Sequence, residues 1–130
     1  MLKKKITYTD YNGVERSEDF YFNLTKAELM EMEMSTLGGF TEMVQRIVAA
    51  NDAPSIIKVF KELILKAYGE KSPDGKRFIK SKEISDAFSQ TEAYSQLFME
   101  LATDANAAAD FVNGLVPNEN KPNAFAAVAK

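Results

Sequence analysis

The sequence predicts a mainly α-helical fold of the α+β class, in which a small N-terminal β-hairpin packs on a single compact helical domain. Apolar and polar residues alternate on both sides of an Asn-Gly pair near the N-terminus, which is the pattern of a hairpin. From residue 25 onward, apolar residues recur at the i, i+3, i+4 spacing of amphipathic helices. A length of 130 residues supports one domain. We expect it to span residues 1–117, followed by a flexible C-terminal tail at residues 118–130.

The hairpin is expected at about residues 4–23. The Asn12-Gly13 pair predicts a two-residue type I′ turn, because asparagine and glycine both tolerate the positive φ that its central positions require. A lone hairpin is only marginally stable in water. The face that carries Phe20 and Phe22 should therefore pack against the helices.

Helices are expected over about residues 25–116. Thr25 and Glu28 fit a capping box at the start of the first helix, which should end before Gly38-Gly39. Later helices should begin near Phe40, Pro54, Ser81, Thr91 and Thr103 or Asp104. Between the third and fourth helices, Gly69 should be a left-handed C-terminal cap and residues 70–77 a loop. The predicted central core contains Phe22, Val44, Ile47, Phe60, Leu63, Ile64, Phe88, Leu97, Phe98, Leu101 and Phe111.

The composition excludes several functional classes. There is no cysteine and no histidine, which rules out disulfides, Cys/His zinc sites, cysteine nucleophiles and Ser-His-Asp triads. Gly69-Glu70-Lys71-Ser72 lacks the first glycine of a P-loop and follows a helix. We therefore expect no enzymatic activity, no cofactor and no metal. A net charge of −3 argues against a nucleic-acid binder, and no apolar run is long enough to cross a membrane.

Methionine is concentrated in one predicted helix. Three of the six methionines lie within residues 30–34, and they cannot all face the same side of that helix. They either fill gaps in the core or form an adaptable apolar binding surface, since methionine suits both roles. The Gly38-Gly39 pair after this helix could act as a hinge.

Lysines form the only basic zone, between residues 58 and 82. They either solvate a surface or attract an acidic partner. The partner-binding residues that we predict from the methionine helix and this zone are Met30, Met32, Met34, Phe40, Lys58, Lys61 and Lys66.

Residues 19–33, 68–81 and 90–101 resemble tail assembly chaperones encoded by siphophages and prophages of Gram-positive bacteria. This resemblance implies a non-enzymatic protein of the host cytoplasm that binds and solubilises the tape measure protein. It also implies recruitment of tail tube subunits, self-association, and absence from the mature virion. Two alternatives remain: a permanent virion component, such as a head–tail completion or decoration protein, and a small nucleic-acid-binding regulator, which only the lysine zone supports.

Overall fold

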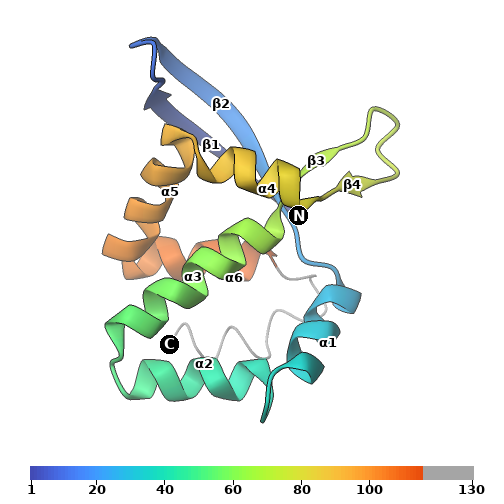
Figure 1. The fold of residues 1–130 in the computed structure, drawn as a ribbon, viewed down its shortest axis with the longest axis vertical. Helices are drawn as coiled ribbons and strands as arrows, with labels where there is room; N and C mark the ends of the chain where they lie inside the picture. Colours follow the sequence, from blue (N-terminus) through green and yellow to red (C-terminus); the bar gives the residue numbers. More distant parts are fainter. Residues whose placement is uncertain (116–130) are drawn as a thin grey trace.

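The computed structural model describes residues 1–115, which form six helices and a four-stranded antiparallel sheet (Figure 1). The strands are β1 (Leu2–Thr9), β2 (Glu15–Phe22), β3 (Tyr68–Lys71) and β4 (Phe78–Ile79), in the spatial order β1-β2-β3-β4. The helices are α1 (Lys26–Ser35), α2 (Phe40–Ala49), α3 (Ala53–Ala67), α4 (Lys82–Ser89), α5 (Glu92–Thr103) and α6 (Ala105–Leu115). The predicted α+β class is confirmed, but the sheet is larger than the predicted hairpin. The expected tail, residues 118–130, lies outside the described residues.

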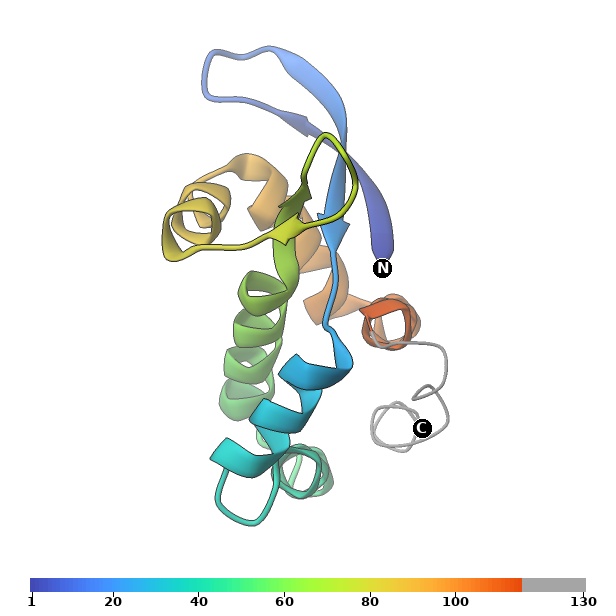
Figure 2. The ribbon, with the colours of Figure 1, turned by 90° about the vertical axis from the view of Figure 1, so that its right-hand side faces the viewer.

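The hairpin forms one end of the molecule, and α1 and α2 form the other (Figures 1 and 2). Strands β1 and β2 pair along their full length, from Leu2 opposite Phe22 to Thr9 opposite Glu15. One face of β1 packs on α5 and α6, and the other face is exposed. The hairpin therefore has a buried face, as predicted.

The predicted type I′ turn is wrong. The structure instead forms a longer loop over residues 10–14, in which Gly13 has a positive φ of 79° and Asn12 does not. The Asp10 carboxylate accepts hydrogen bonds from the amides of Asn12 and Val14 at 2.9 and 3.0 Å. Because an aspartate side chain can satisfy loop amides in this way, a turn with positive φ at both central positions is not needed.

The expectation for Gly69 is also wrong. Helix α3 ends at Ala67, and Gly69 is a buried residue of β3, paired with Tyr21 of β2. A Cβ at residue 69 would lie 2.6 Å from the Phe78 ring and 2.8 Å from the carbonyl oxygen of Ile79. Glycine is therefore required because β4 comes close, and residues 70 and 71 continue the strand instead of starting the predicted loop.

The helix starts agree with the predicted caps. The Thr25–Glu28 capping box is present, and Ser81 and Thr91 accept amide hydrogen bonds at the starts of α4 and α5. Asp104 caps α6 by accepting from the amides of Asn106 and Ala107.

Aromatic side chains join the sheet to the helices at the centre of the core. The rings of Tyr68 and Phe88 stack with centroids 4.0 Å apart, and Phe22 contacts Phe111 edge-on at 5.3 Å. Eight of the predicted core residues are buried, and Ile47, Phe60 and Phe98 are partly buried against them. Core residues that the prediction missed include Ile6, Leu24, Met32, Phe40, Val59 and Leu115.

Candidate functional site

Helix α1 carries the densest group of predicted binding residues. Hydrogen bonds between Thr25 and Glu28 define its N-terminus. The Thr25 hydroxyl accepts from the Glu28 amide at 3.1 Å, and the Glu28 carboxylate accepts from the Thr25 amide at 2.9 Å. Glu28 also pairs with Lys80 at 2.7 Å. Burial alone would raise the pKa of Glu28, but the hydrogen bonds from Lys80 and Thr25 outweigh it and hold that pKa below its ordinary value. Helix α1 is thus tied to the chain segment after β4.

The structure divides the three methionines of α1 between two sides of the helix. Met30 and Met34 are 65% and 81% exposed, and their i, i+4 spacing places them on the same face. Met32 is only 9% exposed and belongs to the core. Leu37, in the turn after α1, is 97% exposed. We call Met30, Met34 and Leu37 the methionine ridge.

The buried members of the predicted site border a small pocket. This pocket lies where α1, α2 and α3 meet and has a volume of about 180 Å³. Its apolar lining is Met32, Phe40 and Leu63, and Lys66 is one of its polar lining residues. Met32 and Phe40 are therefore not part of an exposed ridge, but they are reachable through the pocket.

The three predicted lysines are all exposed on α3, but they do not surround one site. Lys66 lies beside the pocket near α1. Lys61 borders a different and larger pocket of about 450 Å³, which Tyr11, Tyr94 and Phe98 also line. The charged residues nearest to the ridge in sequence are instead Glu31 and Glu33. The structure thus places Lys61 and Lys66 at different pockets, of which only the one beside Lys66 adjoins α1.

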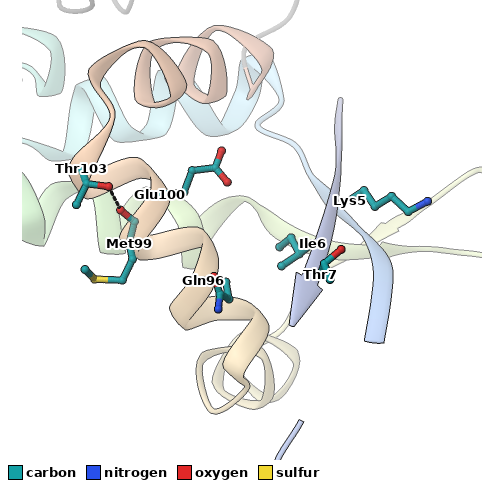
Figure 3. A pocket seen from close by; sticks show the side chains of 7 residues that line it. All are labelled: Lys5, Ile6, Thr7, Gln96, Met99, Glu100 and Thr103. Carbon is teal, nitrogen blue, oxygen red and sulfur yellow. Dashed lines mark hydrogen bonds between the residues drawn. The ribbon is translucent and has the colours of Figure 1, made fainter. Parts of the chain in front are cut away.

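A further pocket of about 240 Å³ lies between β1 and α5 (Figure 3). Three consecutive residues of β1 line it, Lys5 to Thr7, together with Gln96, Met99, Glu100 and Thr103 of α5. The sequence prediction missed both this pocket and Leu37. Leu37 could have been noticed, since a large apolar residue directly before two glycines lies outside any helical stripe.

Two kinds of feature are missing from the described residues. Among residues 1–115 there is no group of three or more acidic side chains placed to hold a metal ion. Within the same residues, no helix has both the length and the apolar character that crossing a membrane requires. The three most exposed large apolar side chains are Leu37 in the turn after α1, Met34 on α1 and Tyr11 in the hairpin loop. The described residues thus form a fold of the α+β class, with exposed apolar side chains on α1 and in the turn after it.

The comparison with known families gives a specific result. The family model of phage tail assembly chaperones matches residues 1–127. The chain therefore belongs to the phage tail assembly chaperone family, whose members are not enzymes. No curated protein and no solved structure gives a significant match to the chain.

Proposed function

We propose that this chaperone binds the tape measure protein of a siphophage or prophage of Gram-positive bacteria and keeps it soluble until tail tube subunits replace the chaperone. The observation that carries this proposal is the methionine ridge. Three large apolar side chains are exposed at one end of the molecule: Met30 and Met34 on α1, whose start is held by a capping box and an ion pair, and Leu37 in the turn after it. Exposed apolar groups of this kind mark protein-binding surfaces.

The ridge suits an apolar helix as its partner. Met30 and Met34 stand one turn apart, so they can pack along the stripe of another amphipathic helix. Methionine side chains adapt to differently shaped partners because they are unbranched and polarizable. A chaperone that coats a long helical protein needs this tolerance, since successive stretches of the partner differ in sequence.

The remaining predicted residues have secondary roles in this proposal. Met32 and Phe40 line the pocket beside α1, where they can receive one apolar side chain of the partner. Gly38 and Gly39, with φ values of 81° and 92°, would let α1 tilt as the partner enters. Lys58, Lys61 and Lys66 would attract acidic residues of the partner, an effect that added salt weakens.

The proposed function also includes further binding partners and a place of action in the host cell. Recruitment of tail tube subunits and self-association along the tape measure protein are parts of the same proposal. Each single contact would be weak and would gain strength from adjacent copies. The protein would act in the host cytoplasm during assembly and would be missing from the finished virion.

Co-expression with the tape measure gene of the same phage tests the ridge. We expect the wild-type chaperone to keep the tape measure protein soluble and the Met30→Glu, Met34→Glu double variant to lose this activity while remaining folded. Val14→Glu is the matched control, since Val14 is an exposed apolar residue of the hairpin loop at the opposite end of the molecule. A folded double variant that still solubilises the tape measure protein would exclude the ridge as the binding surface.

Two other measurements separate the alternative functions. Mass spectrometry of purified virions should find the protein scarce or missing, whereas a completion or decoration protein would be present in fixed proportion. Addition of DNA at physiological salt should cause no mobility shift, whereas a nucleic-acid-binding regulator would cause a salt-dependent one.

A further inference from the structure

Strand β1 is an edge strand in the described part of the molecule, and its main chain is open on one side. The sheet order places β2 on one side of β1 and no described strand on the other. The Asp10 amide donates to the Val14 carbonyl oxygen across the hairpin at 2.9 Å. Because hydrogen-bonded positions alternate along an antiparallel pair, the even-numbered residues of β1 bond to β2. Lys3, Lys5, Thr7 and Thr9 therefore direct their amides and carbonyls to the open edge.

The bonding of β2 to its other neighbour supports this assignment. Asn23, just beyond β2, donates its amide to the carbonyl oxygen of Ala67 at 2.9 Å, next to the Phe22–Tyr68 pair. The odd-numbered residues of β2 thus direct their main-chain amides and carbonyls to β3. The even-numbered residues direct theirs to β1. The hydrogen bond from Asp10 at one end of the β1–β2 pair and the one from Asn23 at the other therefore assign the same residues of β1 to the open edge.

The pocket between β1 and α5 lies along this open edge. Side chains alternate along a strand, so Lys5, Ile6 and Thr7 can line one pocket together only if it follows their main chain. Figure 3 shows Ile6 pointing toward α5, while Lys5 and Thr7 point the other way. Space is therefore open where a further strand would add.

We propose that β1 pairs antiparallel with β1 of a second copy of this chain, in a register centred on Ile6, so that one sheet continues across both copies. This register places Lys5 opposite the partner subunit's Thr7 and Lys3 opposite the partner subunit's Thr9. The outward-directed amides and carbonyls of each strand then find partners on the other. Addition of a strand at a sheet edge is a general mode of protein recognition.

The charge pattern of β1 favours a second copy in this register. The lysines occupy the first half of the strand, and Thr7 and Thr9 leave the open edge of its second half uncharged. A parallel, in-register pair would place lysine opposite lysine, which destabilises a sheet. The antiparallel pair centred on Ile6 places each edge lysine opposite a threonine. The lysines thus select one register and disfavour open-ended aggregation.

The surrounding side chains fit the same arrangement. The Lys4 charge is already paired with Glu100 of α5 at 2.6 Å, so it does not oppose the approach of a second strand. Met99, an exposed apolar residue beside the edge, would be covered by the second copy. The other edge strand, β4, has only two residues and offers a much shorter edge.

This pairing would leave the methionine ridge accessible. The hairpin and α1 lie at opposite ends of the molecule (Figure 1), so a dimer joined through β1 presents two ridges at once. Two linked sites raise the effective concentration of the second one. The proposal concerns this chain alone, so it does not depend on the identity of the tape measure partner.

Sedimentation equilibrium of the purified full chain tests the pairing, with circular dichroism to verify folding. Thr7→Pro removes an amide that faces the open edge and an exposed side-chain hydrogen bond to Ser17, but no main-chain hydrogen bond to β2, so the chain should fold and become monomeric. Thr7→Lys places lysine opposite lysine twice in the dimer and should raise the dimer Kd by roughly tenfold.

Two further variants make the test specific. The double variant Lys5→Thr, Thr7→Lys exchanges the two residues, restores a lysine–threonine pair and should return the Kd to the wild-type value. Ser17→Lys adds the same charge on β2, directly opposite Thr7, but away from the edge, and should leave the Kd unchanged. If Thr7→Pro does not fold, the Thr7→Lys variant and the exchange variant decide.

Two results would overturn the proposal. One is a wild-type chain that is monomeric at the highest concentration at which it stays in solution. The other is a dimer whose Kd does not respond to Thr7→Pro or Thr7→Lys. In that second case, loss of the dimer in the Met30→Glu, Met34→Glu variant would place the contact on the methionine ridge. Failure of tape measure binding with an intact β1 dimer would reject the proposed function and leave this inference standing.

Discussion

The ammonium group of Lys80 lies 2.7 Å from a carboxylate oxygen of Glu28 and 2.6 Å from the main-chain carbonyl oxygen of Asn23. Lys80 follows β4, whereas Glu28 lies in the first turn of α1. One side chain thus connects the β3–β4 hairpin to the start of the helix that carries the methionine ridge. Both charged groups are largely shielded from solvent, so the contact is screened less than a surface ion pair.

Removal of this connection should destabilise the fold. We expect Lys80→Met to lower the free energy of unfolding by about 1–2 kcal/mol, because Glu28 keeps its charge in a partly buried position and loses its cation. The control is Lys82→Met, since Lys82 pairs with Asp86 at the same 2.7 Å but both side chains are exposed. That variant should lower the free energy of unfolding much less, because water screens an exposed ion pair. Urea unfolding measures both values, and equal losses would contradict the argument.

Glu28 should also make stability depend on pH in a predictable direction. Its pKa in the folded protein is lowered from the ordinary value of 4.5. A carboxyl with a lowered folded-state pKa contributes stability that is fully present above the unfolded-state pKa. That contribution disappears as the pH falls through the folded-state pKa.

The measurement compares wild type with Glu28→Gln in urea at several pH values between about 3 and 7, which brackets the ordinary carboxyl pKa. The wild type should be more stable than the variant near neutral pH, and this difference should shrink as the pH falls below 4.5. Asp10 and Asp74 also have lowered pKa values, but they occur in both proteins and cancel in the difference. A difference that stays constant with pH would refute the role of Glu28.

Substitution by alanine should destabilise the fold more at Gly69 than at Gly114, the other glycine without a positive φ. In Gly69→Ala the new methyl group meets the carbonyl oxygen of Ile79 at 2.8 Å, and that oxygen cannot move without displacing β4. We expect a loss of about 1–3 kcal/mol, typical of overpacking. At Gly114 in α6, the nearest atom to a new Cβ is the end of the flexible Leu2 side chain at 2.9 Å. Gly114→Ala should therefore cost much less, and thermal unfolding of both variants would show whether it does.

The parts of the fold that the sequence predicted are those set by local interactions. The caps at Thr25, Ser81 and Thr91 depend on residues three positions apart, and the helical stripes depend on residues within two turns. Strand β3 has a different origin. It pairs with Tyr21 and Phe22, more than 40 residues earlier in the chain, and no local pattern carries that information. The Gly69 error follows directly, because a glycine after a helix has the same local signature whether it ends the helix or permits a close strand.

The candidate site could be predicted only as a set of residue types. The sequence identified α1 as unusual, since its methionines occupy more than one side of the helix. It could not decide which methionine is buried, because that depends on the positions of α2 and α3. Lys61 and Lys66 are close in sequence but border different pockets, since five residues of helix turn their side chains well apart. The open edge of β1 became visible only with the order of the strands.

The contrast between Met32 and Met34 gives the most direct test of how α1 is oriented. The two residues are two positions apart in the same helix, so the same substitution at each has nearly the same effect on helix propensity and net charge. Met32→Glu would bury a carboxylate among core residues of α1, α2 and α3, and should cost more than about 3 kcal/mol or abolish folding. Met34→Glu replaces a side chain that is 81% exposed, and should change stability by less than about 0.5 kcal/mol. Thermal unfolding followed by circular dichroism distinguishes these outcomes. If both variants melt like the wild type, α1 does not pack through Met32, and all three methionines would then be available to a partner.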